Sequence, residues 1–403
     1  MASTDAPHPA KGPLEAACAA ALDEWRSAGL ERRPASFLSA QDPVSVVDGE
    51  RLVNFASANY LGLATHPRVV EAAAAAARRL GAGSGGSRLT AGTTDLHLEL
   101  EAELASWLGY PDAVLFGSGF SANVGLLGAL GEKGRLVCSD AANHASIIDG
   151  ARAARQAGAG LAVYPHLDAT AAEEALAAAP DALGIVVTDG LFSMSGDLAP
   201  IAKLSRAARR RGAALVVDDA HGIGVLGAAG RGAFEEAGAE RPDVLVGALS
   251  KALGGEAGFV CASKEVCELL RQKARTYVFS TALAAPAVAA GLAAVRLAAG
   301  EPERRGRLAR LTTRLRGGLK EAGIPALPGT GPIVAVPAPG AGVAVTAARR
   351  LRGAGLFAPA IRYPTVPRGG EIVRVTLMAT HTEEHVDRLV EELAGALAAP
   401  AGA

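Results

Sequence analysis

Short apolar, β-branched runs alternate with helical patterns through the middle of this chain, and this alternation restricts the fold more than any other feature. Residues 112–116, 135–139, 160–164 and 183–188 are strand-like, and stretches with helical spacing or helix-opening loops separate them. Alternating strands and helices imply a mainly parallel sheet with right-handed crossovers. The sequence therefore predicts an α/β fold, in which ligands lie at the carboxyl ends of the strands.

Reactive residues follow two further strands. Residues 213–222 read AALVVDDAHG, so Asp218 and His221 come at the end of an apolar run suited to burial on both faces. Residues 243–255 repeat the pattern with one lysine, Lys251, followed by small residues. Pyridoxal phosphate (PLP) needs a carboxylate beside its ring nitrogen and a lysine that holds its aldehyde as a Schiff base. We interpret the two strand ends as a PLP pocket, in which Asp218 pairs with the ring nitrogen and His221 reaches the phenolic oxygen.

Other interpretations compete with a PLP pocket. The charged residues could simply be solvated groups at strand ends. The Asp-Asp-x-His sequence could bind a metal, but no second His, Cys or carboxylate cluster has ligand spacing, so no metal site is expected. A Walker A loop is excluded because Gly247 stands only four residues before Lys251 and no Gly-Lys-Ser/Thr follows. Residues 81–88 satisfy G-x-G-x-x-G, but they follow a helix instead of a strand, so a dinucleotide site is not expected.

A strand, a small-residue turn and a helix N-terminus follow one another over residues 112–123. Free backbone N–H groups and the positive end of the helix dipole favour an anion at such a turn. We expect the cofactor phosphate to bind at residues 117–123. His144 stands at a similar strand–helix junction, where a histidine is usually a cap but can also stack on a cofactor ring.

Two arginines are candidates for substrate binding. Arg374 stands in the middle of an apolar strand, residues 372–377, and a charge there is costly to bury unless it is paired. Its partner is either a substrate carboxylate or an internal Asp or Glu. Arg32, in the sequence Glu-Arg-Arg-Pro, belongs either to a solvated face or to a contact with an acidic substrate tail.

The overall composition excludes several classes of partner. The 403 residues carry a net charge of −1, which argues against nucleic-acid binding and against a basic membrane-binding surface. No tract is long and apolar enough to span a membrane. The four cysteines are scattered, as expected for reduced thiols in the cytoplasm.

The chain is predicted to have three segments. The first, residues 1–54, contains a disordered leader over residues 1–13, a helix and a small hairpin. Residues 55–285 form a large PLP-binding α/β domain, and residues 286–403 form a smaller α+β domain. Local patterns add a helix over residues 14–30, a hairpin turn at Asp48-Gly49, a basic helix with a solvated face over 304–320, and a capping box from Thr380 to Glu383 before a final helix over 384–397.

Six motifs in one order make the chain resemble the α-oxoamine synthases, which are PLP enzymes with the aspartate-aminotransferase fold. The resemblance runs from about residue 30 to the final helix. Within the family, residues 360–367 most resemble the branch that forms 8-amino-7-oxononanoate in biotin synthesis. The six motifs are Gly83–Arg88, Ser118–Asn123, Asn143–Ser146, Phe192–Asp197, Val217–Gly222 and Ser250–Gly254.

The resemblance implies a role for individual residues. Lys251 would be the Schiff-base lysine, Asp218 the partner of the ring nitrogen, and His221 that of the phenolic oxygen. His144 would stack on the ring and help to orient the substrate. The other implied positions are the backbone of Gly119 and Phe120, with Ser193 nearby, for the phosphate; Ser280 and Thr281 for the cofactor of a neighbouring subunit; and Arg32, Asn59, Thr365 and Arg374 for the substrate.

Two positions depart from the family's pattern. The threonine that usually stands three residues before the lysine and bonds the phosphate is Ala248 here, and Ser250 would supply a replacement hydroxyl. Losing one neutral hydrogen bond of ~1 kcal/mol should weaken cofactor binding without abolishing it. The other departure is Ala58, where relatives often carry an asparagine whose amide lines the pocket.

The resemblance implies a decarboxylative condensation of L-alanine with a pimeloyl thioester, carried by acyl carrier protein or CoA, in a homodimer. One alternative is a sibling synthase that joins glycine or serine to another acyl-CoA, such as 2-amino-3-ketobutyrate ligase, 5-aminolevulinate synthase or serine palmitoyltransferase. A second is a PLP aminotransferase. A third is a catalytically silent PLP-binding partner subunit, against which the intact Asp218, His221 and Lys251 argue.

Overall fold

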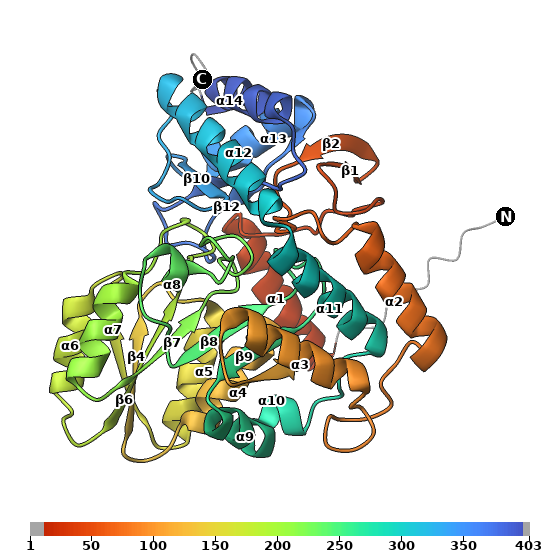
Figure 1. Ribbon diagram of the computed structural model, residues 1–403. Coiled ribbons are helices and arrows are strands. Elements are labelled where there is room, and N and C mark those ends of the chain that lie inside the picture. The colour runs from red at the N-terminus through yellow and green to blue at the C-terminus, as the bar shows by residue number, and fades with distance from the viewer. Residues whose placement is uncertain (1–11, 398–403) are drawn as a thin grey trace.

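A seven-stranded, mainly parallel sheet forms the centre of the computed structural model, which describes residues 12–397 (Figure 1). Its strands are β3 (Asp112–Phe116), β4 (Arg135–Asp140), β5 (Gly160–Tyr164), β6 (Leu183–Asp189), β7 (Ala214–Asp218), β8 (Val244–Ala248) and β9 (Gly258–Ala262). Their order across the sheet is β3-β9-β8-β7-β6-β4-β5. Within this sheet only β9 runs antiparallel to its neighbours, so the predicted α/β architecture is confirmed.

The large sheet is buried on both faces. Along β7, Leu215 and Val217 belong to one cluster of buried apolar side chains and Val216 belongs to another, as the two-residue period of a strand requires. Two helices cover the second face through Leu126 and Ile147. The helices around the sheet are α3 (Asp95–Leu108), α4 (Gly119–Leu130), α5 (Ala145–Gln156), α6 (Ala169–Ala177), α7 (Ile201–Arg210), α8 (Ala233–Glu236), α9 (Lys264–Lys273), α10 (Arg275–Val278) and α11 (Ala285–Gly300).

The C-terminal elements form a smaller group, drawn in blue at the top of Figure 1. Its central sheet has the order β10-β13-β12, and all neighbours are antiparallel. The elements are β10 (Ile333–Pro337), β11 (Leu356–Phe357), β12 (Ala360–Ile361), β13 (Ile372–Thr376), α12 (Pro302–Glu321), α13 (Ala341–Gly353) and α14 (Glu383–Leu397).

A third sheet joins strands from the N-terminal and C-terminal parts of the chain. The predicted hairpin is confirmed as β1 (Val44–Val47) and β2 (Glu50–Asn54), and β11 pairs with β2 in parallel. The predicted N-terminal helix is α1 (Pro13–Ser27), which is followed by α2 (Pro67–Leu80). The part of the predicted disordered leader before residue 12 lies outside the described residues. The division into three segments stays a prediction.

Two local predictions need correction. The capping box at the start of α14 is formed by Thr382 and His385, whose side chains each accept a hydrogen bond from the other's backbone N–H, and not by Thr380 and Glu383. The face of α12 is only partly solvated, since Arg305 is buried and donates to backbone carbonyls of the preceding helix and of a loop. The described residues include no helix of the length and apolarity that crossing a membrane requires.

Candidate active site

Asp218 and Lys251 come together at the carboxyl edge of the large sheet, because β7 and β8 are adjacent parallel strands. Asp218 is buried, and its carboxylate accepts hydrogen bonds from the Asn123 amide at 2.5 Å and from the Ala220 backbone N–H at 3.0 Å. Burial lowers the pKa of the Lys251 amine, while the carboxylates of Asp218 and Asp189 act in the opposite direction. The lysine therefore lies within electrostatic reach of both acids.

Asp219, the neighbour of Asp218, points away from this site. Successive strand residues face opposite sides, and the side chain of Asp219 fills a space in which a Cβ on Gly190, Gly222 or Gly232 would clash with it. Gly232 also has φ of 105°, which other residues rarely adopt. Burial raises the pKa of Asp219 to about 7. Of the two adjacent carboxylates, only Asp218 is placed for cofactor chemistry.

His221 is held by Tyr60, a residue that sequence reasoning did not select. The Tyr60 hydroxyl lies 2.7 Å from His221 Nδ1. Burial raises the pKa of Tyr60 to about 12, with the nearby Arg374 guanidinium opposing this. Burial, together with the positive charges of Lys251 and Arg374, lowers the pKa of His221 well below its usual value. A neutral His221 that accepts a hydrogen bond from the Tyr60 hydroxyl at Nδ1 carries its own proton on Nε2.

Arg374 is buried on β13, and its Nε donates to the Ser193 carbonyl at 2.6 Å. Among residues 12–397 no Asp or Glu forms an ion pair with it, so the internal carboxylate left open by the sequence is not found there. The guanidinium also hydrogen-bonds to the Tyr60 side chain, and its charge, which has no carboxylate partner there, can meet an anionic ligand. The loop that carries Ser193 follows β6, so β6 and β13 together position this guanidinium.

His144 caps the start of α5 and belongs to the same site. Its backbone N–H donates to Asp189 at 2.7 Å, and its Nδ1 lies 2.7 Å from Ser146 Oγ. Burial lowers its pKa, while the charge of Asp218 opposes this. The backbone N–H of Asp189 donates to the side-chain oxygen of Asn143. Burial raises the pKa of the Asp189 carboxyl well above its usual value.

Asn123, Asn143 and Asp189 are site residues that the sequence prediction did not assign roles. Asn123 and Asn143 stand inside motifs that were recognised, but their partners belong to other strands. Asp189 could have been found from its place at the end of β6, since its register partner on β7 is Asp218.

The N-terminus of α4 offers an anion site beside these residues. Ser118 caps the helix by accepting from the Ser121 N–H at 3.1 Å, whereas the N–H groups of Gly119 and Phe120 have no partner among the described residues. The position of a Gly119 Cβ would be 3.3 Å from the Ala248 Cβ, at the end of β8. A phosphate at this turn would therefore lie close to the strand that leads to Lys251.

These groups fit PLP. The buried carboxylate of Asp218 matches the ring nitrogen, and the neutral His221 matches the phenolic oxygen. Lys251, with its lowered pKa, matches the aldehyde, and the two unpartnered N–H groups match the phosphate. Between residues 12 and 397 no group of three or more His, Cys, Asp or Glu side chains could hold a metal ion.

The remaining predicted site residues lie further out. Arg32 Nη2 donates to Thr365 Oγ1 at 3.0 Å, so two positions 333 residues apart form one exposed contact. The Asn59 amide donates to the Gln41 carbonyl at 3.0 Å and accepts from the Ala64 N–H at 3.1 Å, so few of its hydrogen-bonding groups remain for a substrate. The hydroxyl-bearing residues Ser250, Ser280 and Thr281 are exposed in this single chain.

Ala248→Thr is expected to strengthen PLP binding. The side chain at position 248 faces the α4 turn, so a threonine hydroxyl could donate to the phosphate. One added hydrogen bond of about 1 kcal/mol corresponds to an approximately fivefold lower Kd. Equilibrium dialysis of the apoenzyme against PLP measures it, with Ala248→Val as the control of similar shape. Equal affinities for the threonine and valine variants would contradict the prediction.

The comparisons with known proteins agree with this geometry. A family model described as "Aminotransferase class I and II" matches residues 50–393. The chain is 48% identical over 378 residues to the biotin biosynthesis bifunctional protein BioWF of Cutibacterium acnes, covering 92% of this chain and 57% of that protein. It is 45% identical over 381 residues to the 8-amino-7-oxononanoate synthase of Methylococcus capsulatus, covering 94% of this chain and 98% of that protein.

A solved structure shares the whole fold. Serine palmitoyltransferase from S. paucimobilis, solved with bound PLP, superposes with a TM-score of 0.89 at 29% identity, covering 96% of this chain and 98% of that one. The bifunctional relatives are longer, and the chain spans 56–57% of their length.

Proposed function

Because the chain belongs to the α-oxoamine synthases, PLP enzymes of the class I and II aminotransferase family, we propose that it condenses L-alanine with a pimeloyl thioester. The products are 8-amino-7-oxononanoate, CO2 and the free thiol of CoA or acyl carrier protein. The observation that carries the proposal is the match to a named 8-amino-7-oxononanoate synthase over 98% of its length. The approach of Arg374, from β13, to Lys251 and Asp218 at the carboxyl edge of the large sheet supports it.

PLP, when bound, supplies a cationic ring that accepts the electron pair released at the α-carbon of the amino acid. The buried carboxylate of Asp218 would keep the ring nitrogen protonated, and Nε2–H of His221 would donate to the phenolic oxygen. Gly119 and Phe120 would hold the phosphate through their unpartnered N–H groups.

Lys251 is the base that we assign to the α-proton. Its lowered pKa favours the neutral amine that proton removal requires. Arg374 would bind the carboxylate of L-alanine, and its bond to the Ser193 carbonyl limits the rotation of the guanidinium. Fixing the carboxylate fixes which bond of the α-carbon faces the base. His144, whose lowered pKa favours the neutral imidazole, would polarise the thioester carbonyl.

Arg32→Ala is expected to raise the KM for pimeloyl thioester while leaving the KM for a thioester without a distal carboxylate unchanged. Arg32 is exposed, and its one partner within residues 12–397 is the neutral Thr365, so its charge can meet an acidic acyl tail. Exposed charge pairs are worth about 1 kcal/mol, which predicts a three- to tenfold rise. Arg33→Ala, at a residue whose side chain is 85% exposed, is the matched control. A rise of equal size for both thioesters would contradict this role.

A sibling reaction is the second candidate, because serine palmitoyltransferase shares the fold at a TM-score of 0.89. In that case serine or glycine would replace L-alanine, with a different acyl-CoA.

A substrate panel separates the candidates. The purified chain is incubated with PLP and with alanine, glycine or serine against acyl thioesters of graded length, and thiol release and ketone product are both followed. The proposal expects the highest kcat/KM for L-alanine with the pimeloyl thioester. A preference for serine or glycine would support the sibling reaction, and transamination of a keto acid without thiol release would overturn both.

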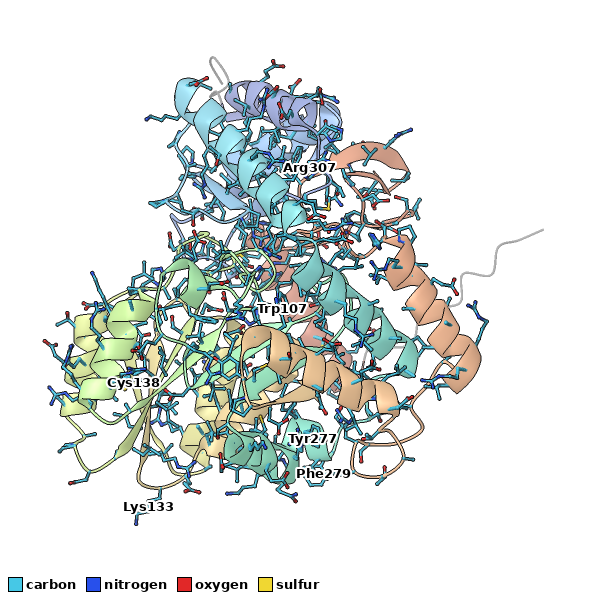
Figure 2. The ribbon with its side chains drawn as sticks, in the orientation of Figure 1. Trp107, Lys133, Cys138, Tyr277, Phe279 and Arg307 are labelled. Atoms are coloured by element: carbon cyan, nitrogen blue, oxygen red, sulfur yellow. The ribbon has the colours of Figure 1, made fainter. Side chains whose placement is uncertain are left out.

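We propose that the enzyme is a cytoplasmic homodimer. The apolar side chains of Leu14, Leu22 and Trp25 on α1 are 78%, 51% and 40% exposed in the single chain, and exposed apolar patches mark contact surfaces. Phe279, which precedes Ser280 and is labelled in Figure 2, is 72% exposed as well. Analytical ultracentrifugation should give twice the chain mass of 40.5 kDa. Sedimentation at the chain mass would refute the dimer.

A further inference from the structure

His166, which follows β5, lies between two carboxylates that belong to different parts of the fold. Its Nδ1 is 2.9 Å from Asp140 Oδ1, at the end of β4, and its Nε2 is 3.2 Å from Asp197 Oδ2. Asp197 belongs to the loop of residues 191–198 that follows β6. A neutral imidazole has a single N–H and can donate to one of these oxygens only. Both contacts are satisfied when His166 is an imidazolium ion.

The Asp140 side of this contact is fixed. Asp140 is buried, and its two oxygens also accept from the backbone N–H groups of Ala142 at 2.8 Å and Leu167 at 2.9 Å. Leu167 has φ of 62°, a conformation that an L-residue with a large side chain rarely adopts and that persists only where the surroundings hold it. The backbone that carries His166 is therefore anchored to the strand end.

The Asp197 side belongs to a loop that reaches the candidate active site. Within the loop, the Phe192 N–H donates to the Asp197 carbonyl at 2.9 Å, and an antiparallel β-bridge joins Leu191 to Leu198. The Phe192 ring also packs against His166, with ring centroids 4.5 Å apart and planes at 88°. The next residue, Ser193, presents the carbonyl that accepts from Arg374 Nε.

We propose that His166 is a positioning residue, which as an imidazolium ion holds loop 191–198 to the end of β4 and thereby orients Arg374 for the substrate carboxylate. The assignment of that carboxylate rests on the proposed function. The ordering of the loop by His166 does not, because it depends only on contacts within this chain.

The charges around His166 determine how this contact depends on pH. Asp140 faces it from β4 and Asp197 from the loop; Tyr164 of β5 and Asp189 of β6 interact with Asp140, and Arg316 of α12 interacts with Asp197. The hydrogen bond with Asp140, and then that with Asp197, raises the pKa of His166 above 6.5, against the opposing effect of partial burial. A raised pKa means that the contact is complete at low pH and is lost as pH rises through the folded-state value.

The first test uses the full-length enzyme with bound PLP and 15N-labelled histidine, and His166→Gln assigns the resonance. We expect both ring nitrogens of His166 to be protonated at pH 6.5 and to lose a proton only above that pH. Chymotrypsin cleavage after Phe192 should be faster in His166→Gln than in the wild-type enzyme, and should speed up in the wild-type enzyme as pH rises through the measured pKa. A ring that is neutral at pH 6.5, or equal cleavage rates, would overturn the proposal even if the enzyme were active.

The second test measures the KM for the amino acid against kcat across the same pH range. His166→Gln should raise KM about three- to tenfold at low pH, where the wild-type contact is intact, with a smaller change in kcat. Asp197→Asn should restore the bond to a neutral His166, since the amide can donate to Nε2, and so remove the pH dependence of KM. His66→Asn, which keeps a capping side chain at the start of α2, is the control histidine variant. An unchanged KM in His166→Gln, or a pH dependence that persists in Asp197→Asn, would overturn the role.

Discussion

Lys251→Ala is expected to abolish the condensation and the visible absorbance that PLP gains when it is bound to a lysine. The variant loses both the covalent bond to the cofactor aldehyde and the base that removes the α-proton. A positioned base alone contributes about 10²- to 10⁴-fold, so kcat should fall by at least about 10³-fold. The measurement is thiol release under saturating substrates, together with an absorbance spectrum of the purified protein.

The matched control for this variant is Lys264→Ala, which removes an exposed lysine at the start of α9. It should keep both the rate and the spectrum. Far-UV circular dichroism should be the same for both variants, since neither side chain fills the core. If Lys251→Ala retained the absorbance band, the covalent attachment would have to lie elsewhere and the assignment of the whole site would fail.

Asp218→Asn is expected to have the second largest effect. The carboxylate is buried, and an amide of the same shape would leave a cationic ring nitrogen without its counter-charge. Breaking a buried ion pair costs about 3–5 kcal/mol, which corresponds to a loss of about 10²- to 5 × 10³-fold in kcat. The covalent bond to Lys251 should survive, so the protein should stay coloured. Single-turnover kinetics measure the loss at the step that removes the α-proton.

Asp219→Asn separates chemistry from stability at the adjacent position. Asp219 is buried among the backbone of three glycines and accepts from the Ala233 N–H, so its substitution should lower the melting temperature. It should change kcat little, because the side chain points away from the site. A larger loss of kcat in Asp219→Asn than in Asp218→Asn would mean that the two carboxylates have been assigned the wrong way round.

The sheet and the strand-end residues could be predicted because both follow from local pattern. The apolar runs before Asp218 and Lys251 are long enough to identify strands, and parallel strands bring their carboxyl ends to one edge. The α4 turn was predictable for the same reason, since a strand, small residues and a helix follow one another in sequence.

The contacts that complete the site could not be predicted in this way. Tyr60 reaches His221 across 161 residues, and Asn123 reaches Asp218 across 95. Each of these side chains is an ordinary buried polar residue until the fold supplies its partner. The sequence did not indicate His166 either, because one histidine after a strand is uninformative until the fold places the carboxylates of a strand end and of another loop beside it.

The capping box shows how a correct pattern can be assigned to the wrong residues. Thr380 and Thr382 both precede the final helix, and Glu383 gave the earlier threonine the expected spacing. The buried imidazole of His381 accepts from the Met378 N–H and stacks on Phe55, and the cap lies two residues further along the chain than expected, at Thr382. Tertiary packing therefore decided between two local solutions.

Residues 55–60 and 376–379 are joined by backbone hydrogen bonds, and this has a consequence for synthesis on the ribosome. The carbonyl of Tyr60 accepts from the Ala379 N–H at 2.6 Å, and that of Phe55 accepts from the Thr376 N–H at 2.8 Å. The central sheet can form as soon as β9 has emerged from the exit tunnel, since all of its strands precede that point. The segment that carries Tyr60 gains these two contacts only after β13 has been made, and a nascent chain stalled before β13 would present a folded sheet that still lacks Arg374.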